Sequence, residues 1–206
     1  MSSGPKPLSP RADARRRQIL EGAIRAFAAR GFYRTRVSDI AKSAGVADGT
    51  IYLYFEGKDD LLAQVLRQAL DSFWERGEEY VRAGATAPER LDRLVELHLR
   101  YMGEDRNLAT VFQVDLRHSP HFLGEVSRRI FRDYLERVAG LVAEGQSQRQ
   151  LRGDLTPRQA AHMIFGVLDQ LVTSWVLSQR NYRLESLTPV AQDFVRRAMV
   201  SGSSAT

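Results

Sequence analysis

Residues 34–58 combine hydroxyl-bearing, basic and very small side chains at a spacing that suits contact with a nucleic acid. A short amphipathic helical pattern ends at Gly45, and a second short pattern follows in which Val46, Ile51 and Phe55 share one face. A glycine-containing turn of about three or four residues between two short helices is typical of a helix-turn-helix. The sequence therefore predicts a DNA-reading element.

The other face of the second short helix supplies the central candidates for DNA contact. Gly49 permits close approach of the backbone, and the Thr50 hydroxyl can bind a phosphate. Tyr52 and Tyr54 are two residues apart, so they point to different sides of a helix and at least one can be exposed. Asp48 could accept a hydrogen bond from cytosine N4 but would repel phosphates, and both readings stay open.

Residues at the starts of predicted helices are further candidates for DNA contact. We expect Thr35 to be the N-cap of the first short helix, which would bring Arg36 and Ser38 near DNA. Lys58 opens the following helix, where a cation could add to the backbone amides in binding a phosphate. The full set of predicted DNA contacts is Arg36, Ser38, Lys42, Ala47, Gly49, Thr50, Tyr52, Tyr54 and Lys58.

A second group of candidates lies later in the chain and suits a ligand cavity. Residues 103–120 interleave polar side chains with a strong apolar stripe, a mixture that fits a cavity with a polar mouth. Arginines in this region could hold an anionic group or could form a solvated basic face. We expect His98 to be a core histidine rather than a ligand contact. The predicted ligand contacts are Arg106, Phe112, Gln113, Arg117, His118, Arg128, Arg129, Phe131, Phe165, Asp169 and Trp175.

Catalytic and metal sites are not expected. The chain has no cysteine, which excludes disulfides, thiolate nucleophiles and thiolate metal ligands. Ser119 beside His118 fits no nucleophile motif, so an enzyme such as a thioesterase is disfavoured. His118 and His121 flank Pro120 without an evident third ligand, so they do not predict a metal site. We expect no enzyme activity and no cofactor.

Helical periodicity, caps and breakers run through the whole chain and predict an all-α fold. A first helix begins near Arg11 and ends at Gly31, and a long helix covers residues 58–83. Later helices start after Thr86 and Thr156 and at Thr188, and each of these threonines is followed within two residues by a proline. Pro120 separates a further helix from the segment before it.

The distribution of charge divides the chain. Residues 1–58 carry 11 basic and 5 acidic side chains, a balance of +6, while residues 59–206 carry 19 and 20, a balance of −1. Basic charge gathered around the helix-turn-helix favours binding to a phosphate backbone, although a solvated basic segment is the alternative. We predict a disordered arm at 1–10, a DNA-binding domain at 11–57, and a ligand-binding and dimerisation domain at 58–206.

The helix that follows Pro157 is apolar almost all round, which is more than one core can cover. Together with the final helix it predicts a helical interface between two copies of the chain. Uninterrupted apolar runs are shorter than the ~20 residues that a membrane span requires, and the N-terminus lacks the apolar core of a signal peptide. We expect a cytoplasmic homodimer with no membrane partner.

The run VSDIAKSAGVADGTIYLYFEGKDDLL, residues 37–62, resembles the DNA-binding domain of TetR-family transcriptional regulators. The resemblance implies an all-helical homodimer with a three-helix DNA-binding domain, a larger ligand-binding domain, and repression that a small molecule relieves. That family often has lysine where this chain has Asp48, which departs from its contact pattern. The positions that the family turns toward DNA correspond to Ser38, Gly49, Thr50, Tyr52, Tyr54 and Lys58.

Residues 103–120 and the run MIFGVLDQLVTSWVL, residues 163–177, are similar to the ligand domain of the FadR-type members of that family. Those proteins repress fatty-acid degradation and respond to long-chain acyl-CoA. The resemblance implies a repressor that binds a pseudo-palindromic operator and that long-chain acyl-CoA releases. The alternative is a TetR-type multidrug or efflux regulator, which would need acidic or aromatic residues for cationic ligands. Candidates for the CoA phosphates are Arg106, Arg117, Arg128, Arg129, Arg180 and Arg183.

Overall fold

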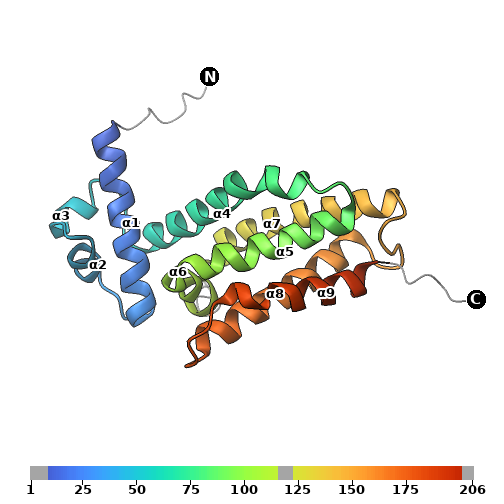
Figure 1. Cartoon of the computed structure of the whole chain (residues 1–206). Coiled ribbons are helices and arrows are strands. Elements are labelled where there is room, and N and C mark those ends of the chain that lie inside the picture. Colours follow the sequence, from blue (N-terminus) through green and yellow to red (C-terminus); the bar gives the residue numbers. More distant parts are fainter. Residues whose placement is uncertain (1–8, 116–122, 201–206) are drawn as a thin grey trace, which may run out of the picture. The chain divides into compact units, whose positions relative to one another are not determined.

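The computed structural model describes residues 9–115 and 123–200, apart from the side chains at 114, 115, 123–128 and 130. Every regular element in these ranges is helical (Figure 1), which confirms the all-α prediction. The α-helices are α1 (Pro10–Arg30), α2 (Val37–Ala44), α3 (Asp48–Ile51), α4 (Lys58–Arg82), α5 (Ala87–Glu104), α6 (Arg106–Thr110), α7 (Leu123–Ser147), α8 (Pro157–Leu177) and α9 (Thr188–Met199). Val111–Asp115 forms a π-helical turn, η1, and Leu184–Leu187 a 3₁₀ turn, η2.

The chain divides into two compact units, Met1–Leu66 and Arg67–Thr206. We call them the N-terminal unit and the C-terminal unit. The division falls inside α4, whereas the sequence-based boundary lies before this helix. Of the predicted arm, residues 1–8 lie outside the described residues, while Ser9 and Pro10 already begin α1. The Ser9 hydroxyl accepts a hydrogen bond from the backbone N–H of Ala12 at 3.3 Å and so caps the helix.

The N-terminal unit is built on close contact between α1 and α2. Gly22 of α1 has no side chain where α2 crosses it, and a Cβ there would lie 2.6 Å from the Cβ of Ala44. Gly45 ends α2 in the left-handed conformation, with a φ of 67°, which glycine adopts without steric penalty. The fully buried side chains Ile19, Phe27, Ile40, Ile51, Leu61 and Leu62 form the core of this unit.

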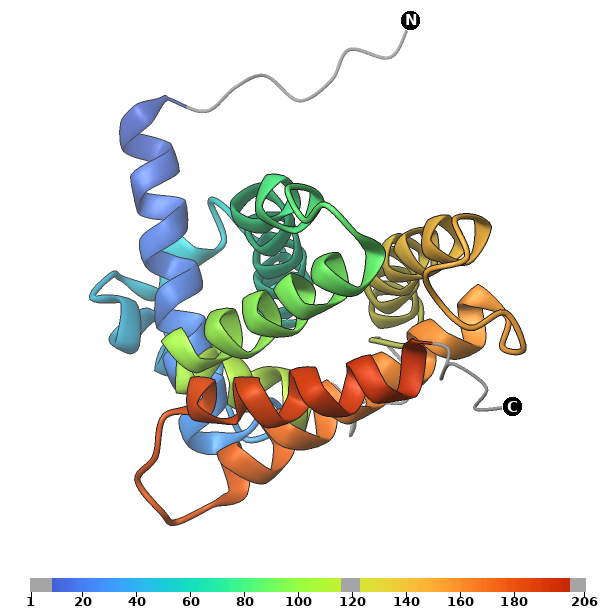
Figure 2. The ribbon, with the colours of Figure 1, turned by 45° about the vertical axis from the view of Figure 1, so that its right-hand side comes forward.

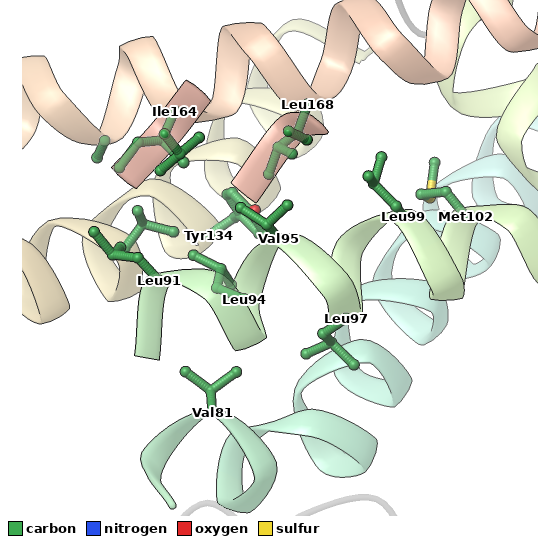
Figure 3. Packing of buried hydrophobic residues seen from close by; sticks show 14 of the residues in the cluster. Val81, Leu91, Leu94, Val95, Leu97, Leu99, Met102, Tyr134, Ile164 and Leu168 are labelled. Atoms are coloured by element: carbon green, nitrogen blue, oxygen red, sulfur yellow. The ribbon is translucent and has the colours of Figure 1, made fainter. Parts of the chain in front are cut away.

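The C-terminal unit is organised around α5. Leu91, Leu94 and Leu99 of α5 are almost wholly buried, and they share one hydrophobic cluster with Leu168 of α8 (Figure 3). Helices α8 and α9 lie side by side in both views (Figures 1 and 2), and α7 packs along α8. Burial of these apolar faces is the main force that holds the helices together.

Helix α8 is the most apolar long helix in the described ranges. By length and hydropathy alone it could cross a membrane, but a core helix of a soluble protein satisfies the same criterion. Its first turn carries a reciprocal cap, in which the hydroxyl of Thr156 accepts from the N–H of Gln159 and the Gln159 side chain accepts from the N–H of Thr156. The predicted start of this helix at Thr156–Pro157 is therefore present.

Candidate DNA-binding surface and ligand cavity

Helices α2 and α3 turn most of the predicted DNA contacts outward. On the inner side, Ile51 is fully buried and Phe55 is 3% exposed, so these two residues anchor α3 and the turn after it. Thr50, Tyr54 and Lys58 are half-buried. The exposed members of the predicted set are Arg36, Ser38, Lys42, Ala47, Gly49 and Tyr52, and we call this group the reading surface.

Helix α3 is shorter than the sequence predicts. It covers only Asp48–Ile51, so Tyr52 is its C-cap residue and Tyr54 lies in the turn beyond. The two tyrosines are therefore presented by a turn, and not by the helix to which we assigned them. Leu53, which sequence reasoning missed, is 80% exposed between them. The signal for Leu53 was present, because Ile51 and Phe55 already account for the buried stripe.

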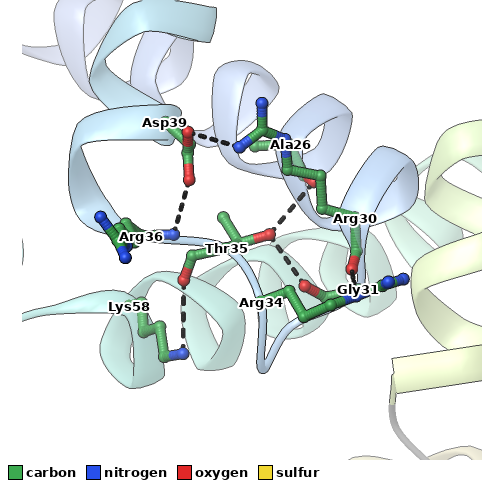
Figure 4. A network of polar contacts seen from close by, with 8 residues as sticks. All are labelled: Ala26, Arg30, Gly31, Arg34, Thr35, Arg36, Asp39 and Lys58. Carbon is green, nitrogen blue, oxygen red and sulfur yellow. Dashed lines mark hydrogen bonds and ion pairs between the residues drawn. The ribbon is translucent and has the colours of Figure 1, made fainter.

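Thr35 is not the N-cap of α2, which corrects that prediction (Figure 4). Its hydroxyl is buried and donates to the carbonyls of Gly31, at 2.8 Å, and Ala26, at 3.2 Å. Arg36 takes the N-cap position, and its N–H is bound by the Asp39 carboxylate at 2.9 Å. Asp39 also accepts from Arg30 at 2.7 Å, so the first turn of α2 is fixed to the end of α1. The Thr35 hydroxyl donates to the carbonyls that surround it, so it is not available to cap the start of α2.

Lys58 lies differently from the predicted phosphate contact. Its ammonium donates to the carbonyls of Phe32, at 3.1 Å, and of Tyr33 and Thr35, both at 3.3 Å. It also lies 4.5 Å from the centre of the Phe32 ring, within the range of a cation–π contact. An ammonium has three N–H donors, and these carbonyls can take all of them. Lys58 thus fastens the start of α4 to the α1–α2 loop.

The C-terminal end of α2 is held by side chains of α1. Gln18 donates to the carbonyl of Ala44 at 2.7 Å, and Arg25 donates to that of Ser43, also at 2.7 Å. These carbonyls have no partner within the helix, so the two donors satisfy them and fix α2 on α1. Periodicity could not reveal this pair, because both donors are polar residues on a helix that is largely solvated.

The C-terminal unit encloses a cavity with aromatic walls, here called the aromatic cavity. Helices α4, α5, α7 and α8 and the η1 turn all contribute to its lining. Ring centroids within this group lie 5.4–6.4 Å apart, for example Phe131 to Phe165 at 5.4 Å and His98 to Phe165 at 6.4 Å. The lining residues are Ala69, Leu70, Phe73, His98, Tyr101, Met102, Phe112, Gln113, Phe131, Tyr134, Phe165 and Asp169.

A few polar groups interrupt this apolar wall. His98 Nδ1 and the hydroxyl of Tyr134 are 3.0 Å apart and buried. Burial lowers the pKa of His98 to about 4, although the nearby charge of Asp169 acts in the opposite direction. Burial also raises the pKa of Tyr134, so both groups are neutral near pH 7. Gln113 accepts a hydrogen bond from the Thr173 hydroxyl at 2.7 Å.

The predicted ligand contacts divide between the cavity and other places. Phe112, Gln113, Phe131, Phe165 and Asp169 all line the cavity. Sequence reasoning missed cavity residues on α4, α5 and α7, where helical spacing looks the same as that of ordinary core residues: Ala69, Leu70, Phe73, Tyr101, Met102 and Tyr134. His98, which we expected to be a core histidine, is buried and also lines the cavity.

Arg106 and Trp175 do not line the cavity, contrary to the prediction. Arg106 donates to the carbonyls of Trp175, at 2.9 Å, and Ser178, at 2.8 Å, and lies 4.8 Å from the Trp175 ring centre. It therefore caps the C-terminal end of α8, where carbonyls favour a cation. Trp175 itself is buried and donates to the carbonyl of Tyr182 at 2.9 Å.

Among the residues that the structure describes, the remaining predicted arginines give no cluster at the cavity. Arg129 is exposed, and Arg117 and His118 lie outside the described residues, as does the side chain of Arg128. Arg180 is exposed, and the exposed Arg183 pairs with Glu185 at 3.3 Å. Among the described residues, the cavity is lined by aromatic and apolar groups and the carboxylate of Asp169, without an arginine.

The cavity is narrow in this structure. It encloses about 60 Å³, enough for a few water molecules when each needs ~10–15 Å³ on the same measure. The η1 turn, which supplies Phe112 and Gln113, is a π-helical segment, and such segments often occur at functional sites. A ligand with a long chain must therefore widen the cavity as it binds.

A long apolar groove, the α8–α9 groove, lies on the surface of the C-terminal unit. Met163 of α8 and Val190 and Phe194 of α9 line it and are 58%, 66% and 59% exposed. Its volume of about 1170 Å³ far exceeds that of the aromatic cavity. Helix α8 thus presents Phe165 and Asp169 to the cavity and Met163 to the groove, a division that spacing alone did not settle.

Two known protein families match the two units of this chain. The family "Bacterial regulatory proteins, tetR family" matches residues 19–65, and "YsiA-like protein, C-terminal region" matches residues 66–198. The "Fatty acid metabolism regulator protein" of Bacillus subtilis (strain 168) is 38% identical over 185 residues, which are 90% of this chain and 93% of that protein. The chain belongs to the TetR family of bacterial regulatory proteins.

Two solved structures of this TetR-family group are similar over most of their length. The fatty acid degradation regulator FadR from Bacillus halodurans has a TM-score of 0.86 and 33% identity, over 93% of this chain and 97% of its own. FadR from Bacillus subtilis in complex with stearoyl-CoA has a TM-score of 0.82 and 37% identity, over 87% and 96%. The predicted family and FadR-type resemblance are confirmed, and the family consists of regulators and not enzymes.

Proposed function

We propose that this TetR-family regulator is a homodimeric repressor of fatty-acid degradation genes, which a long-chain acyl-CoA releases from a pseudo-palindromic operator. The observation that carries the proposal is the aromatic cavity in a chain that is 37% identical to a FadR crystallised with stearoyl-CoA. The reading surface supplies the DNA-binding half of this function.

The α8–α9 groove supports the dimer. Large apolar side chains that gather on one exposed face are typical of an interface between subunits. Met163, Val190 and Phe194 would be covered by the same groove of a second copy, because two-fold dimers bury one patch on both subunits. A two-fold dimer would place two reading surfaces on half-sites ~34 Å apart, about one turn of DNA.

The composition of the cavity supports an acyl chain. Each methylene moved from water into an apolar site contributes about 0.8 kcal/mol, so a chain of about twelve carbons gains roughly 9 kcal/mol before ordering costs. His98 and Tyr134 are both neutral near pH 7, so these two groups place no charge beside an apolar chain in the cavity.

The narrow cavity supports coupling between ligand and DNA. A ligand changes an equilibrium only if it binds one state more tightly than the other. Because the cavity must widen, the acyl chain would select a form of the C-terminal unit that differs from this one. A 10- to 100-fold loss of DNA affinity needs about 1.4 to 3 kcal/mol of coupling, a small part of the binding energy of the chain.

A cationic ligand is the second candidate effector. Aromatic faces around a carboxylate are the usual site for a quaternary ammonium, and this cavity offers Phe73, Tyr134 and Phe165 together with Asp169. Arginines, which would disfavour a cationic ligand, are absent from the described cavity lining. The apolar chain is favoured because two relatives that span most of this chain, at 38% and 33% identity, are fatty-acid regulators.

Calorimetric titration of the purified protein separates the two effectors. Palmitoyl-CoA should bind with micromolar or tighter affinity, and Asp169→Asn should leave that affinity within about twofold. Tetrabutylammonium should bind only weakly. If tetrabutylammonium bound tightly, lost its affinity in Asp169→Asn, and palmitoyl-CoA gave no heat, the effector would be a cation and the acyl-CoA assignment would be wrong.

A further inference from the structure

Helices α4 and α5 form a hairpin that supplies one wall of the aromatic cavity. The two helices are joined by the short segment 83–86 and fold back on each other (Figure 1). The cavity lies at the far end of this hairpin, roughly 15–20 Å from the turn along each helix at about 1.5 Å per residue. The lining residues that come from the hairpin are Ala69, Leu70, Phe73, His98, Tyr101 and Met102.

Between the turn and the cavity the two helices are in tight contact. Arg90 of α5 donates to the carbonyl of Gly84 at 2.9 Å, which fixes the turn. Further along, Leu97 of α5 is buried against Gly77 of α4, and a Cβ on this glycine would overlap the leucine side chain (Figure 3). Gly77 and Leu97 therefore form a pivot, and any opening of the hairpin is largest at the cavity end.

At the cavity end, the hydroxyl of Tyr101 on α5 donates to the backbone carbonyl of Ala69 on α4 at 2.8 Å. The same hydroxyl interacts with Ser72, and the Tyr101 ring lies 5.4 Å from that of Phe73, centre to centre. All three partners belong to α4. The carbonyl of Ala69 also accepts from the N–H of Phe73 within the helix, because a carbonyl oxygen has two lone pairs. Tyr101 is therefore an additional partner of this carbonyl and joins the two helices across the cavity wall.

Other polar contacts between α4 and α5 join two side chains. Arg76 pairs with Glu104 at 2.8 Å, with both side chains about half exposed, and Tyr80 donates to Glu96 at 2.6 Å. Exposed ion pairs contribute little to stability, and long side chains can follow a small shift of either helix by changing rotamer. The bond from Tyr101 ends on the α4 backbone, and the tyrosine ring is rigid. It therefore fixes the distance between the two helices at the cavity.

We propose that the Tyr101–Ala69 hydrogen bond holds the aromatic cavity in its narrow form, and that a ligand chain enters only when this bond breaks. Because the bond exists in the narrow form alone, it opposes every ligand that needs the wide form. In the wide form the half-buried Tyr101 hydroxyl can bind water instead. Tyr101 is thus a positioning residue that acts through α4. The inference rests on the proposed function only for the identity of the natural ligand.

The test removes one hydroxyl, in Tyr101→Phe, and titrates the protein with palmitoyl-CoA and with the neutral apolar fluorophore N-phenyl-1-naphthylamine. Affinity for both ligands should rise about three- to tenfold, the factor that one net hydrogen bond supplies. Ala69 keeps its partner within the helix, so the variant leaves no buried carbonyl unpaired, and a thermal melt checks that it folds. Tyr80→Phe is the matched control, because it also removes a hydroxyl between α4 and α5 but does not line the cavity. Its affinities should stay within about twofold of the wild type.

Stopped-flow mixing with the fluorophore gives a second readout, which a purely structural role of Tyr101 would not change. If the bond must break before entry, the observed binding rate levels off at high fluorophore concentration, at the rate of opening. This limiting rate should be several-fold higher in Tyr101→Phe than in the wild type or in Tyr80→Phe. A rate that rises in proportion to concentration in all three proteins would contradict an opening step.

The two ligands separate this inference from the proposed effector. If the wild type binds the fluorophore but not palmitoyl-CoA, the effector is wrong, and the fluorophore alone decides the role of Tyr101. If palmitoyl-CoA binds but Tyr101→Phe has unchanged or lower affinity for both ligands, the effector stands and the role of Tyr101 is wrong. An equal rise in Tyr80→Phe would show general loosening of the hairpin and would also overturn the inference. If neither ligand binds to any of the proteins, both proposals are wrong.

Discussion

His98 and Tyr134 form a hydrogen-bonded pair inside the aromatic cavity, with 3.0 Å between the imidazole Nδ1 and the phenol oxygen. Burial lowers the pKa of His98 to about 4, so the ring is neutral in the folded protein at neutral pH. The pair satisfies two polar groups that would otherwise be costly in an apolar wall. It also ties α5 to α7 across the cavity.

The pair predicts a specific dependence of stability on pH. His98 has an ordinary pKa of 6.5 when unfolded and about 4 when folded, so between these values only the unfolded chain takes up the proton. Stability is therefore full above about pH 6.5 and is lost as pH falls toward 4. Linkage gives a loss of about 2 kcal/mol between pH 7 and pH 5 from this residue. Urea unfolding at fixed protein concentration measures it.

The matched control for that measurement is His98→Gln, which keeps a hydrogen-bonding group beside Tyr134 but does not titrate. The variant should lose about 2 kcal/mol less than the wild type over the same pH interval. Equal losses in the two proteins would show that His98 is not buried in its neutral form.

Substitution of Lys58 and of Lys42 should distinguish a lysine that fixes a helix in place from a lysine that contacts a DNA phosphate. Lys58→Met removes three hydrogen bonds to carbonyls and should lower the free energy of unfolding by about 1–3 kcal/mol. Lys42→Met, at an exposed residue of the reading surface, should leave stability unchanged but reduce the salt slope of DNA binding by about one. A reduced salt slope in Lys58→Met with normal stability would restore the phosphate contact that the sequence suggested.

Two glycines of the N-terminal unit should respond in opposite ways to alanine. Gly22→Ala places a Cβ 2.6 Å from that of Ala44 and should destabilise the unit by about 1–3 kcal/mol or more. Gly49→Ala meets nothing within 4 Å, so folding should be unaffected. Its DNA affinity should nevertheless fall if the backbone lies against DNA. Thermal unfolding and DNA binding of both variants check this, and normal DNA affinity in Gly49→Ala would remove Gly49 from the contact set.

We expect the dimer to form through the α8–α9 groove and to dissociate when a charged side chain is placed in that groove. Phe194→Asp places a carboxylate at a residue that is 59% exposed in the single chain but would be buried in the dimer. Sedimentation should show at least tenfold weaker association, because an unpaired buried charge is costly. Leu177→Asp is the control, since Leu177 is also exposed, at 69%, but lies outside the groove. Dimers that persist in Phe194→Asp would place the interface elsewhere.

Sequence periodicity predicted the helices well because their signals are local. The caps at Thr86 and Thr156 lie where the sequence places them, and Gly31 and Gly45 end their helices as expected. The prediction that Thr35 is the N-cap of α2 was wrong for a physical reason. A threonine before a helix looks the same in sequence whether its hydroxyl caps that helix or turns inward to the carbonyls of the helix before it.

The ligand cavity was predictable only in part. The segment around Phe112 and Gln113 drew attention because polar and apolar residues alternate in it, and it does line the cavity. Arg106 was predicted as a ligand contact because of its charge, but it caps the C-terminal end of α8 and does not line the cavity. Whether an arginine faces a ligand or a helix terminus depends on tertiary packing between residues far apart in the chain. Tyr134 was missed because an aromatic residue at helical spacing predicts a core position equally well.

The central claim is that long-chain acyl-CoA controls DNA binding, and fluorescence anisotropy tests it most directly. A labelled palindromic operator, selected from random duplexes with the purified protein, would be titrated with protein in the presence and absence of palmitoyl-CoA. We predict a 10- to 100-fold loss of DNA affinity, equivalent to about 1.4–3 kcal/mol, with CoA alone having little effect. Unchanged affinity with palmitoyl-CoA, together with release by a cationic ligand such as tetrabutylammonium, would contradict the proposal.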